Sequence, residues 1–343
     1  MKHLFAWLIA GILVAQLHAS AGEWVTYPGK AGPGKGKHIV LLAGDEEYRS
    51  EEGLPMLGKI LSQRHGFKCT VLFSLNPTNG LIDPNDHANI PGIEALDSAD
   101  LVIVLWRFRE LPDDKMKHFV NYFLAGKPFI ALRTSTHAFS YDHLKNSPYA
   151  KYDWHSKEWS GGFGKQVLGE TWVDHWGHHK SEATRGVLEA TSNNHPILRG
   201  VLSIFADTDV YEAHPPADAK ILVWGQVLKG MKPDDAPAER KRKTNQGVEQ
   251  PVNDPMQPVA WWREYVNEAG KRNKIVTTTM GSATDLQDAN LRRLLINASY
   301  WAVGLEKKIK PGSNVDYVGE FKPTFYGFNE YKRGMKPADH ELK

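Results

Sequence analysis

The segment "GETWVDHWGHHKSEATR" (residues 169–185) places three histidines within five positions, next to one carboxylate. These residues are His175, His178 and His179, beside Asp174. Neutral imidazoles are ligands for zinc and related transition metals, and a single imidazole can act as a general base near neutral pH. Gly177 lets the chain turn, so that the two flanking rings can face inward. A hydrogen-bonded polar cluster that binds no metal is the alternative.

The first half of the chain predicts a parallel sheet that would hold such a loop. Apolar runs without alternation are typical of strands buried on both faces, and they are separated here by amphipathic helices. The expected strands cover residues 37–44, 68–75, 99–106 and 127–133, and the expected helices cover 50–66, with Ser50 as N-cap, and 112–126. The fold class is α/β: a flavodoxin-like three-layer sandwich with a mainly parallel central sheet. "AGDEEYRS" follows the first strand in place of G-x-G-x-x-G, so we expect no nucleotide cofactor.

The second half continues the same domain, which we place at residues 37–304 after an N-terminal segment, 22–36. A strand is expected over 219–227, a hairpin over 258–265 and 274–281, and a helix over 288–304. Residues 229–258 are polar and Pro-rich, which predicts a loop whose "ERKRK" run is solvated. The C-terminal tail, 305–343, is expected to pack on the domain surface.

Composition excludes several classes of protein. A formal net charge of +2 gives no electrostatic reason to expect a nucleic-acid partner. The single cysteine, Cys69, cannot form an internal disulfide and lies in a strand-like apolar run, so we expect a buried small side chain. Stability must therefore come from burial of the core.

The N-terminus predicts export. Lys2 and His3 precede an almost wholly apolar run, and the small residues Ala19 and Ala21 match a signal-peptidase site. We expect a signal peptide over residues 1–21, a periplasmic or extracellular mature protein, and no stable membrane insertion after cleavage, because the run is short for a bilayer span.

Two loops are expected to meet the histidine segment. Ligands of open α/β sheets bind beyond the carboxyl ends of the strands. The loop after the fourth strand carries Arg133 and His137, and the loop after the first strand carries the run from Asp45 to Arg49. His137, His175 and His179 are therefore expected to converge in one site.

Several segments together resemble the ThuA-like (trehalose-utilisation) family. They include "HIVLLAGDEEYRSEE", "KPFIALRTSTHAF", "VLGETWVDHWGHHKSEATR", "TDVYE", "PVAWWREY", "TTTMGSATDLQDANLRRLLINASYWAVGLE" and "KPTFYGF". The resemblance implies a fold related to class I glutamine amidotransferases and a role in carbohydrate metabolism. Amidotransferases need a thiolate on the turn after a central strand. Arg133 stands at that position here, which predicts a protein without glutamine amidotransferase activity.

Within this resemblance the histidine segment follows the pattern H-x-H-x-G-x-H. His175 and His179 match its second and third histidines, whereas Val173 occupies the first position. His137 could replace the missing ligand. The predicted metal set is therefore His137, His175 and His179, with zinc as the expected divalent transition metal.

The leading hypothesis, which the resemblance to this family suggests, is an exported enzyme that acts on a sugar or keto-glycoside, with a small-molecule carbohydrate as its partner. His137 or His179 would be the base that removes a proton beside a carbonyl, and His175 a metal ligand or an acid. Arg133 and Arg49 would anchor substrate oxygens. The expected residues of the site are His137, His179 and Arg133 for catalysis, and Tyr48, Arg49, Trp106 and Asp209 for substrate binding. Asp209 could alternatively orient the histidines or cap a loop. The alternative function is a non-catalytic carbohydrate-binding or structural protein.

Overall fold

The computed structural model describes residues 22–343, and the expected signal peptide lies outside them. The α-helices of this range are α1 (Ser50–His65), α2 (Asp113–Leu124) and α3 (Ala289–Ala302). The strands of the main sheet are β1 (Trp24–Tyr27), β2 (His38–Gly44), β3 (Lys68–Phe73), β4 (Leu101–Trp106), β5 (Phe129–Leu132), β7 (Thr184–Leu188), β8 (Ile204–Ala206), β10 (Lys220–Val227), β13 (Gln257–Val266) and β14 (Arg272–Thr278). Two short pairs join β6 (Asp174–His175) to β9 (Tyr211–Glu212) and β11 (Lys241–Lys243) to β12 (Glu249–Pro251).

The centre of the main sheet is parallel. Its strand order is β1-β3-β2-β4-β5-β14-β13-β10-β7-β8, and the five neighbours from β3 to β14 run in the same direction. If the five parallel strands are numbered by their order along the chain, they lie side by side in the order 2-1-3-4-5. This order is that of flavodoxin-like proteins, so the predicted fold class is confirmed.

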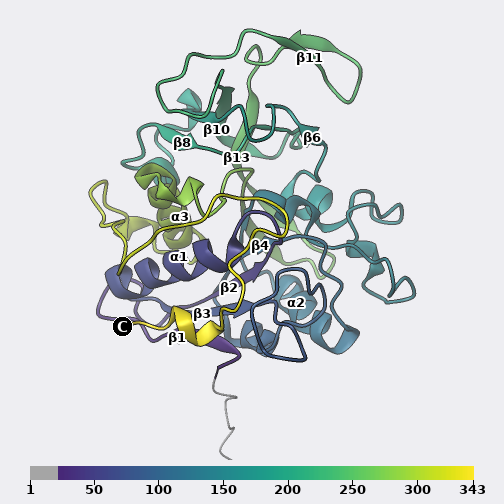
Figure 1. Ribbon diagram of the computed structural model, residues 1–343, viewed down its shortest axis with the longest axis vertical. Coiled ribbons are helices and arrows are strands. Elements are labelled where there is room, and N and C mark those ends of the chain that lie inside the picture. Colours follow the sequence, from purple (N-terminus) through teal and green to yellow (C-terminus); the bar gives the residue numbers. More distant parts are fainter. Residues whose placement is uncertain (1–21) are drawn as a thin grey trace, which may run out of the picture.

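Helices cover both faces of the parallel part, as Figure 1 shows. Because side chains alternate along a strand, Ile39 and Leu41 of β2 join the core beneath α1 and α3, whereas Val40 and Leu42 join the core beneath α2. Cys69 on β3 belongs to the first of these cores and is fully buried, as predicted. The three-layer arrangement follows from strands that are apolar on both faces.

Two parts of the chain differ from the prediction. The segment before β2 contributes β1, which pairs antiparallel with β3 at the sheet edge; four residues were too short to show a pattern. Residues 229–258 are not a simple loop, because β11 and β12 form a hairpin within them. Both of its strands are polar, and the apolar pattern that predicts strands is therefore missing.

Helix α1 begins differently from the expectation. Arg49 occupies the cap position in a left-handed conformation (φ 59°) and makes no side-chain cap. The hydroxyl of Ser50 instead accepts the N–H of Asp45 at 3.0 Å. Ser50 therefore fixes the loop after β2 rather than the helix end, and the prediction of a Ser50 N-cap is wrong.

The C-terminal tail runs back from α3 across α1 towards β1 (Figure 1). The carbonyl oxygen of Asn314 lies 2.8 Å from His65 Nε2 on α1, and Tyr27 of β1 donates to the carbonyl of His340 at 2.8 Å. No helix among residues 22–343 combines the length and apolarity needed to cross a bilayer.

The sheet has a topological switch point between β2 and β4. The chain leaves β2 for β3 on one side and later adds β4 on the other, so the loops that follow β2 and β4 diverge there. Flavodoxin-like sheets bind their ligands in the crevice at this position. The loops involved begin at Asp45 and Arg107.

Candidate functional site

Asp209 is the centre of a polar cluster at this edge of the sheet. It lies in the loop between β8 and β9, and its side chain is completely shielded from water. Its Oδ2 lies 2.8 Å from His175 Nδ1, and its Oδ1 lies 3.0 Å from His179 Nδ1. Burial opposes ionisation, but the Arg133 guanidinium and the hydrogen bonds from both histidines outweigh it and hold the pKa of Asp209 well below its usual range. Asp209 is therefore a buried anion that orients two imidazoles.

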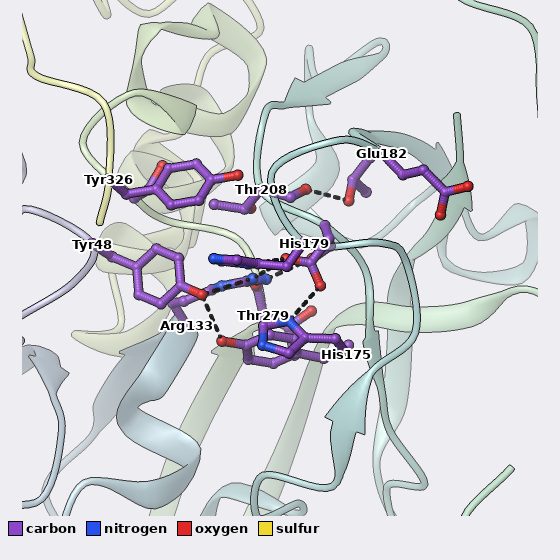
Figure 2. Close-up of polar contacts among 12 residues, drawn as sticks. Tyr48, Arg133, His175, His179, Glu182, Thr208, Thr279 and Tyr326 are labelled. Atoms are coloured by element: carbon purple, nitrogen blue, oxygen red, sulfur yellow. Dashed lines mark hydrogen bonds and ion pairs between the residues drawn. The ribbon is translucent and has the colours of Figure 1, made fainter. Parts of the chain in front are cut away.

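Arg133, labelled in Figure 2 beside Tyr48, holds Asp209 through an ion pair. It follows β5 in a left-handed conformation (φ 41°), and its Nη2 donates to Asp209 Oδ1 at 2.8 Å. Its Nη1 donates to the carbonyl oxygens of Asp209 and Thr279 at 2.6 and 2.7 Å. Because the side chain is fully buried and both terminal nitrogens are engaged, Arg133 holds Asp209 in place. The expectation that it anchors substrate directly is corrected.

His175 offers an open ring nitrogen. Strand β6 positions it through the pairing of His175 with Tyr211 of β9. Its Nδ1 is held by Asp209, and no hydrogen bond from another residue of the range 22–343 reaches its Nε2. The side chain is 32% exposed. A buried carboxylate on one nitrogen and solvent access at the other is the arrangement of a general base.

His179 lies between two carboxylates. Besides its bond to Asp209, its Nε2 lies 3.1 Å from Glu47 Oε1. Burial lowers its pKa, but the hydrogen bonds and charges of Asp209 and Glu47 outweigh this and raise it to about 9. His179 is therefore an imidazolium at neutral pH, and its ring centroid lies 4.6 Å from that of His175.

A charged chain continues from His179 to the switch point. Glu47 Oε2 accepts from Arg107 Nη1 at 3.0 Å, and Glu46 Oε1 lies 3.3 Å from the same nitrogen. Burial and the neighbouring Asp45 raise the pKa of Glu46 to about 7, against the charges of Arg107 and Arg109. The acidic run after β2 thus enters the site through Glu47. The position of this loop was predictable from the strand pattern, but its partner Arg107 was not, because Arg107 belongs to no motif of its own.

His137 occupies a neighbouring aromatic pocket instead of the cluster. Its ring lies 5.3 Å from Phe108, 5.8 Å from Trp154 and 6.0 Å from Trp172, and the Trp172 ring lies 5.9 Å from that of His175. Burial, then the charges of Arg107 and Arg133, hold the pKa of His137 well below its usual range. His137 and His175 therefore both lie near the Trp172 ring, but His137 is not part of the group whose potential ligand atoms come together.

The group that could hold a metal ion is His175, His179 and Asp209. One potential ligand atom from each lies within 4.8 Å of the others. Asp209 therefore takes the place that the sequence analysis gave to His137. Asp209 replaces His137 in the group because the loop between β8 and β9 places the Asp209 carboxylate within hydrogen-bond distance of both rings. The spacing of residues along the chain did not show this.

Three predicted substrate-binding residues are buried, which corrects their assignment. Tyr48 accepts from Arg133 and Tyr211 through its hydroxyl and is fully covered. Arg49 donates to carbonyl oxygens of the tail, at Phe325 and Gly327. Trp106 lies in the α2 core against Phe119 and Phe139. None of these side chains presents a surface to a ligand.

Aromatic rings that remain partly exposed form the rim beside His175. They are Phe108, Trp154 and Trp172, and Phe328 of the tail is 52% exposed. The Arg107 guanidinium lies 4.7 Å from both the Phe108 and the Phe328 rings. Aromatic faces of this kind suit the apolar face of a sugar ring. The abundance of tryptophan had suggested such faces without locating them.

The β11–β12 hairpin holds the histidine segment from outside. Arg240 donates to Glu182 at 2.6 Å and to the carbonyl of Trp176 at 3.0 Å, and Arg242 pairs with Asp174. Lys241 and Lys243 point to solvent. The "ERKRK" run is therefore only half solvated, because its arginines fix the loop that carries His175 and His179.

A family model described as trehalose utilisation, ThuA, matches residues 46–302, well over half of the chain. The chain belongs to this family. ThuA proteins are part of the glutamine amidotransferase-like superfamily, and membership fits a role in carbohydrate metabolism. The match ends before the C-terminal tail.

Two solved structures of ThuA-like proteins are similar to this chain. The protein from Bacteroides uniformis ATCC 8492 has 15% sequence identity and a TM-score of 0.46, with 83% of this chain and 98% of that chain covered. The protein from Parabacteroides merdae ATCC 43184 has 15% identity and a TM-score of 0.44, with coverage of 78% and 90%. No functionally curated protein matches the chain.

Proposed function

We propose that this ThuA protein is an exported enzyme that acts on a sugar or keto-glycoside by proton transfer at His175, His179 and Asp209. One observation carries the proposal: Asp209 binds both imidazoles through Nδ1, yet the Nε2 atoms of the two rings have different surroundings. His175 keeps Nε2 open, whereas His179 is held as a cation by a second carboxylate. An imidazole with an open nitrogen beside a fixed imidazolium provides a candidate base next to a positive charge.

The proposed reaction begins beside a carbonyl group of the sugar. His175 Nε2 takes the proton of the hydroxyl-bearing carbon next to the carbonyl. The C–H electron pair forms a carbon–carbon double bond, and the π pair of the carbonyl moves to its oxygen to give an enediolate. The His179 cation, whose own N–H groups are bonded to Asp209 and Glu47, stabilises the developing negative charge through its positive charge. Return of a proton to the other carbon gives an isomer, and departure of a β-substituent gives elimination. These roles replace the expectation of His137 or His179 as base, since His137 lies outside the group of His175, His179 and Asp209 and His179 is already protonated.

A divalent transition metal fits the same residues. Two imidazoles and one carboxylate are a suitable donor set, and their ligand atoms are already close together. His175, His179 and Asp209 would hold the ion after the imidazoles had lost the protons that now join them to Asp209. When bound, the metal would supply a Lewis acid for the carbonyl oxygen. Zinc is our expectation for its identity.

The metal content of the purified protein tests the proposed metal site separately from the proposed reaction. The mature protein is loaded with zinc, dialysed and analysed by mass spectrometry beside His179→Gln and His178→Gln. His178 is exposed and outside the candidate group, so its variant is a matched control. A metal site predicts that about one ion is retained by the wild type and by His178→Gln and is lost from His179→Gln. Equal and negligible zinc in all three would exclude it.

Glutamine hydrolysis by a thiolate has no nucleophile in this chain. Its only cysteine, Cys69, is fully buried on β3, and burial raises its pKa. Arg133 stands on the turn after β5 instead. We therefore propose a chemistry that differs from that of the amidotransferases.

A panel of sugars and oxidised glycosides tests the enzyme proposal. Wild type and His175→Gln are compared for turnover and for binding by calorimetry. Conversion by the wild type with at least a roughly 100-fold loss in His175→Gln supports proton transfer. The second candidate, a non-catalytic carbohydrate-binding protein, is favoured by the exposed aromatic rim. It predicts binding without conversion, with His175→Gln harmless and Trp172→Ala damaging.

A further inference from the structure

The C-terminal tail lies against the candidate site, outside the segment that matches the family. Tyr326 of the tail lies beside Tyr48 and close to His179 in Figure 2. We propose that residues 324–328, which we name the site strap, position the His179 ring, with Tyr326 as the positioning residue. The proposal rests on the proposed function only for the chemical role of His179.

The site strap is anchored on its far side by α1 and the loop before it. Arg49 is fully buried and donates to the carbonyl oxygens of Phe325 and Gly327. The N–H of Gly327 donates in return to the carbonyl of Glu47 at 2.9 Å. Thr324 donates from both its N–H and its hydroxyl to Glu52. Because a buried guanidinium without partners is costly, Arg49 ties the strap firmly to the loop that carries Glu47.

Tyr326 connects this anchored segment to the site. Its ring is completely buried and lies 5.2 Å from the Tyr48 ring and 5.5 Å from the His179 ring. Its hydroxyl donates to the carbonyl oxygen of Asp207 at 2.9 Å, two residues before Asp209. Tyr326 thus contacts one histidine directly and also fixes the loop that carries the carboxylate for both.

The orientation of the His179 ring depends on packing of the kind that Tyr326 provides. Its two hydrogen bonds, at 3.0 and 3.1 Å, point to carboxylates on different loops, so both form only while the ring keeps one orientation. The centroids of the His175 and Tyr48 rings lie 4.6 and 6.4 Å from that of His179, and the Tyr326 ring packs against another side of His179. Without Tyr326 the ring gains room to rotate and water can compete for both carboxylates. The strap therefore keeps the imidazolium aligned.

Exchange of the His179 ring protons tests the proposal without a substrate. Both ring N–H protons are covered by carboxylates, so downfield proton spectra of the metal-free mature protein should show them exchanging slowly with water. The signals are assigned by their loss in His179→Gln. We compare Tyr326→Phe, Tyr326→Leu and Tyr326→Ala, with Tyr331→Ala as a control at a tail residue bonded to Asp83.

The site strap predicts wild-type exchange in Tyr331→Ala, which lies outside the strap. Tyr326→Phe keeps the ring but loses the hydrogen bond to Asp207, so its exchange should be faster than in the wild type and slower than in Tyr326→Ala. Tyr326→Ala should accelerate exchange of both protons at least about tenfold, by local opening. Tyr326→Leu keeps apolar bulk but loses the planar ring, so it should accelerate exchange by a similar factor. It replaces Tyr326→Ala in the test if the alanine variant does not fold. Unchanged exchange in a folded Tyr326→Ala or Tyr326→Leu variant would overturn the proposal. Failure of the wild type to convert any sugar would overturn the proposed function and leave this measurement valid.

Discussion

Arg133 Nη2 lies 2.8 Å from Asp209 Oδ1, and both side chains are completely shielded from water. A buried ion pair adds little stability by itself, because desolvation of both charges offsets their attraction. Its effect here is to keep Asp209 ionised, and an ionised Asp209 can hold His175 and His179 at once. The geometry of the candidate site therefore depends on a residue whose side-chain hydrogen bonds within residues 22–343 go to Asp209, Thr279 and Tyr48 and not to either histidine.

Removal of this arginine should be strongly destabilising. In Arg133→Met, Asp209 would remain buried without its cation, and the free energy of unfolding should fall by about 3–5 kcal/mol. Arg272→Met is the control, because Arg272 pairs with Glu264 at the surface and should lose less than about 1 kcal/mol. Urea denaturation followed by circular dichroism measures both. Similar losses in the two variants would contradict the role of the Arg133–Asp209 pair.

Stability should also depend on pH through His179. Its pKa in the folded protein, about 9, lies above the ordinary value of about 6.5 expected when unfolded. Its hydrogen bonds therefore stabilise the fold fully below about pH 6.5, and this contribution is lost as the pH rises through about 9. The measurement is the difference in unfolding free energy between metal-free wild type and His179→Gln from pH 6 to 10. A difference that grows with pH would have the wrong sign for this account.

The main sheet could be predicted from the sequence because its strands carry their own signal. β2 and β4 are apolar on both faces, and α1 and α2 have one apolar face each, so periodicity alone indicated the layers. The hairpin of β11 and β12 has no such signal. Its strands are stabilised by Arg240 and Arg242, whose partners are distant in the chain.

The candidate site was predicted only where its residues lie close together in the sequence. His175 and His179 are close in sequence. Substrate binding, orientation of the histidines and loop capping were all considered for Asp209, and its carboxylate lies within hydrogen-bond distance of both rings. Glu47, Arg107 and Tyr326 come from three loops whose meeting depends on sheet order and on the path of the tail. Trp106 was misassigned because a tryptophan at a strand end has the same sequence signal whether it lines a site or fills a core.

The β11–β12 hairpin should control the order of the histidine segment. In Arg242→Ala the pair with Asp174 is lost, and amide hydrogen exchange over residues 174–182 should become faster by roughly a factor of ten. Lys241→Ala is a matched control, because Lys241 is the neighbouring residue of the same strand and its side chain is 66% exposed. Exchange measured by mass spectrometry should be unchanged in the control. Equal protection in wild type and Arg242→Ala would show that the hairpin does not restrain the segment.

Export is a separate prediction from residues 1–21. A reporter protein fused to residues 1–30 should leave the cytoplasm, and its N-terminal sequence should begin at the position of Gly22. The same fusion with charged residues in place of Leu8 and Ile9 should stay inside, because the apolar region is interrupted. Cytoplasmic retention of the unmodified fusion would contradict the signal peptide, and an uncleaved membrane-bound fusion would indicate an anchor.

The central claim is that His175, oriented by Asp209, removes a proton from carbon in a sugar. The most direct measurement is the incorporation of solvent deuterium into sugars and keto-glycosides in D2O, followed by proton NMR, with wild type and His175→Gln compared at equal concentration. The account predicts that the wild type exchanges or converts at least one compound at a carbon beside a carbonyl, and that His175→Gln does so at least about 100-fold more slowly while it remains folded. Equal rates in the two proteins, or no exchange by the wild type with a compound that it demonstrably binds, would contradict it.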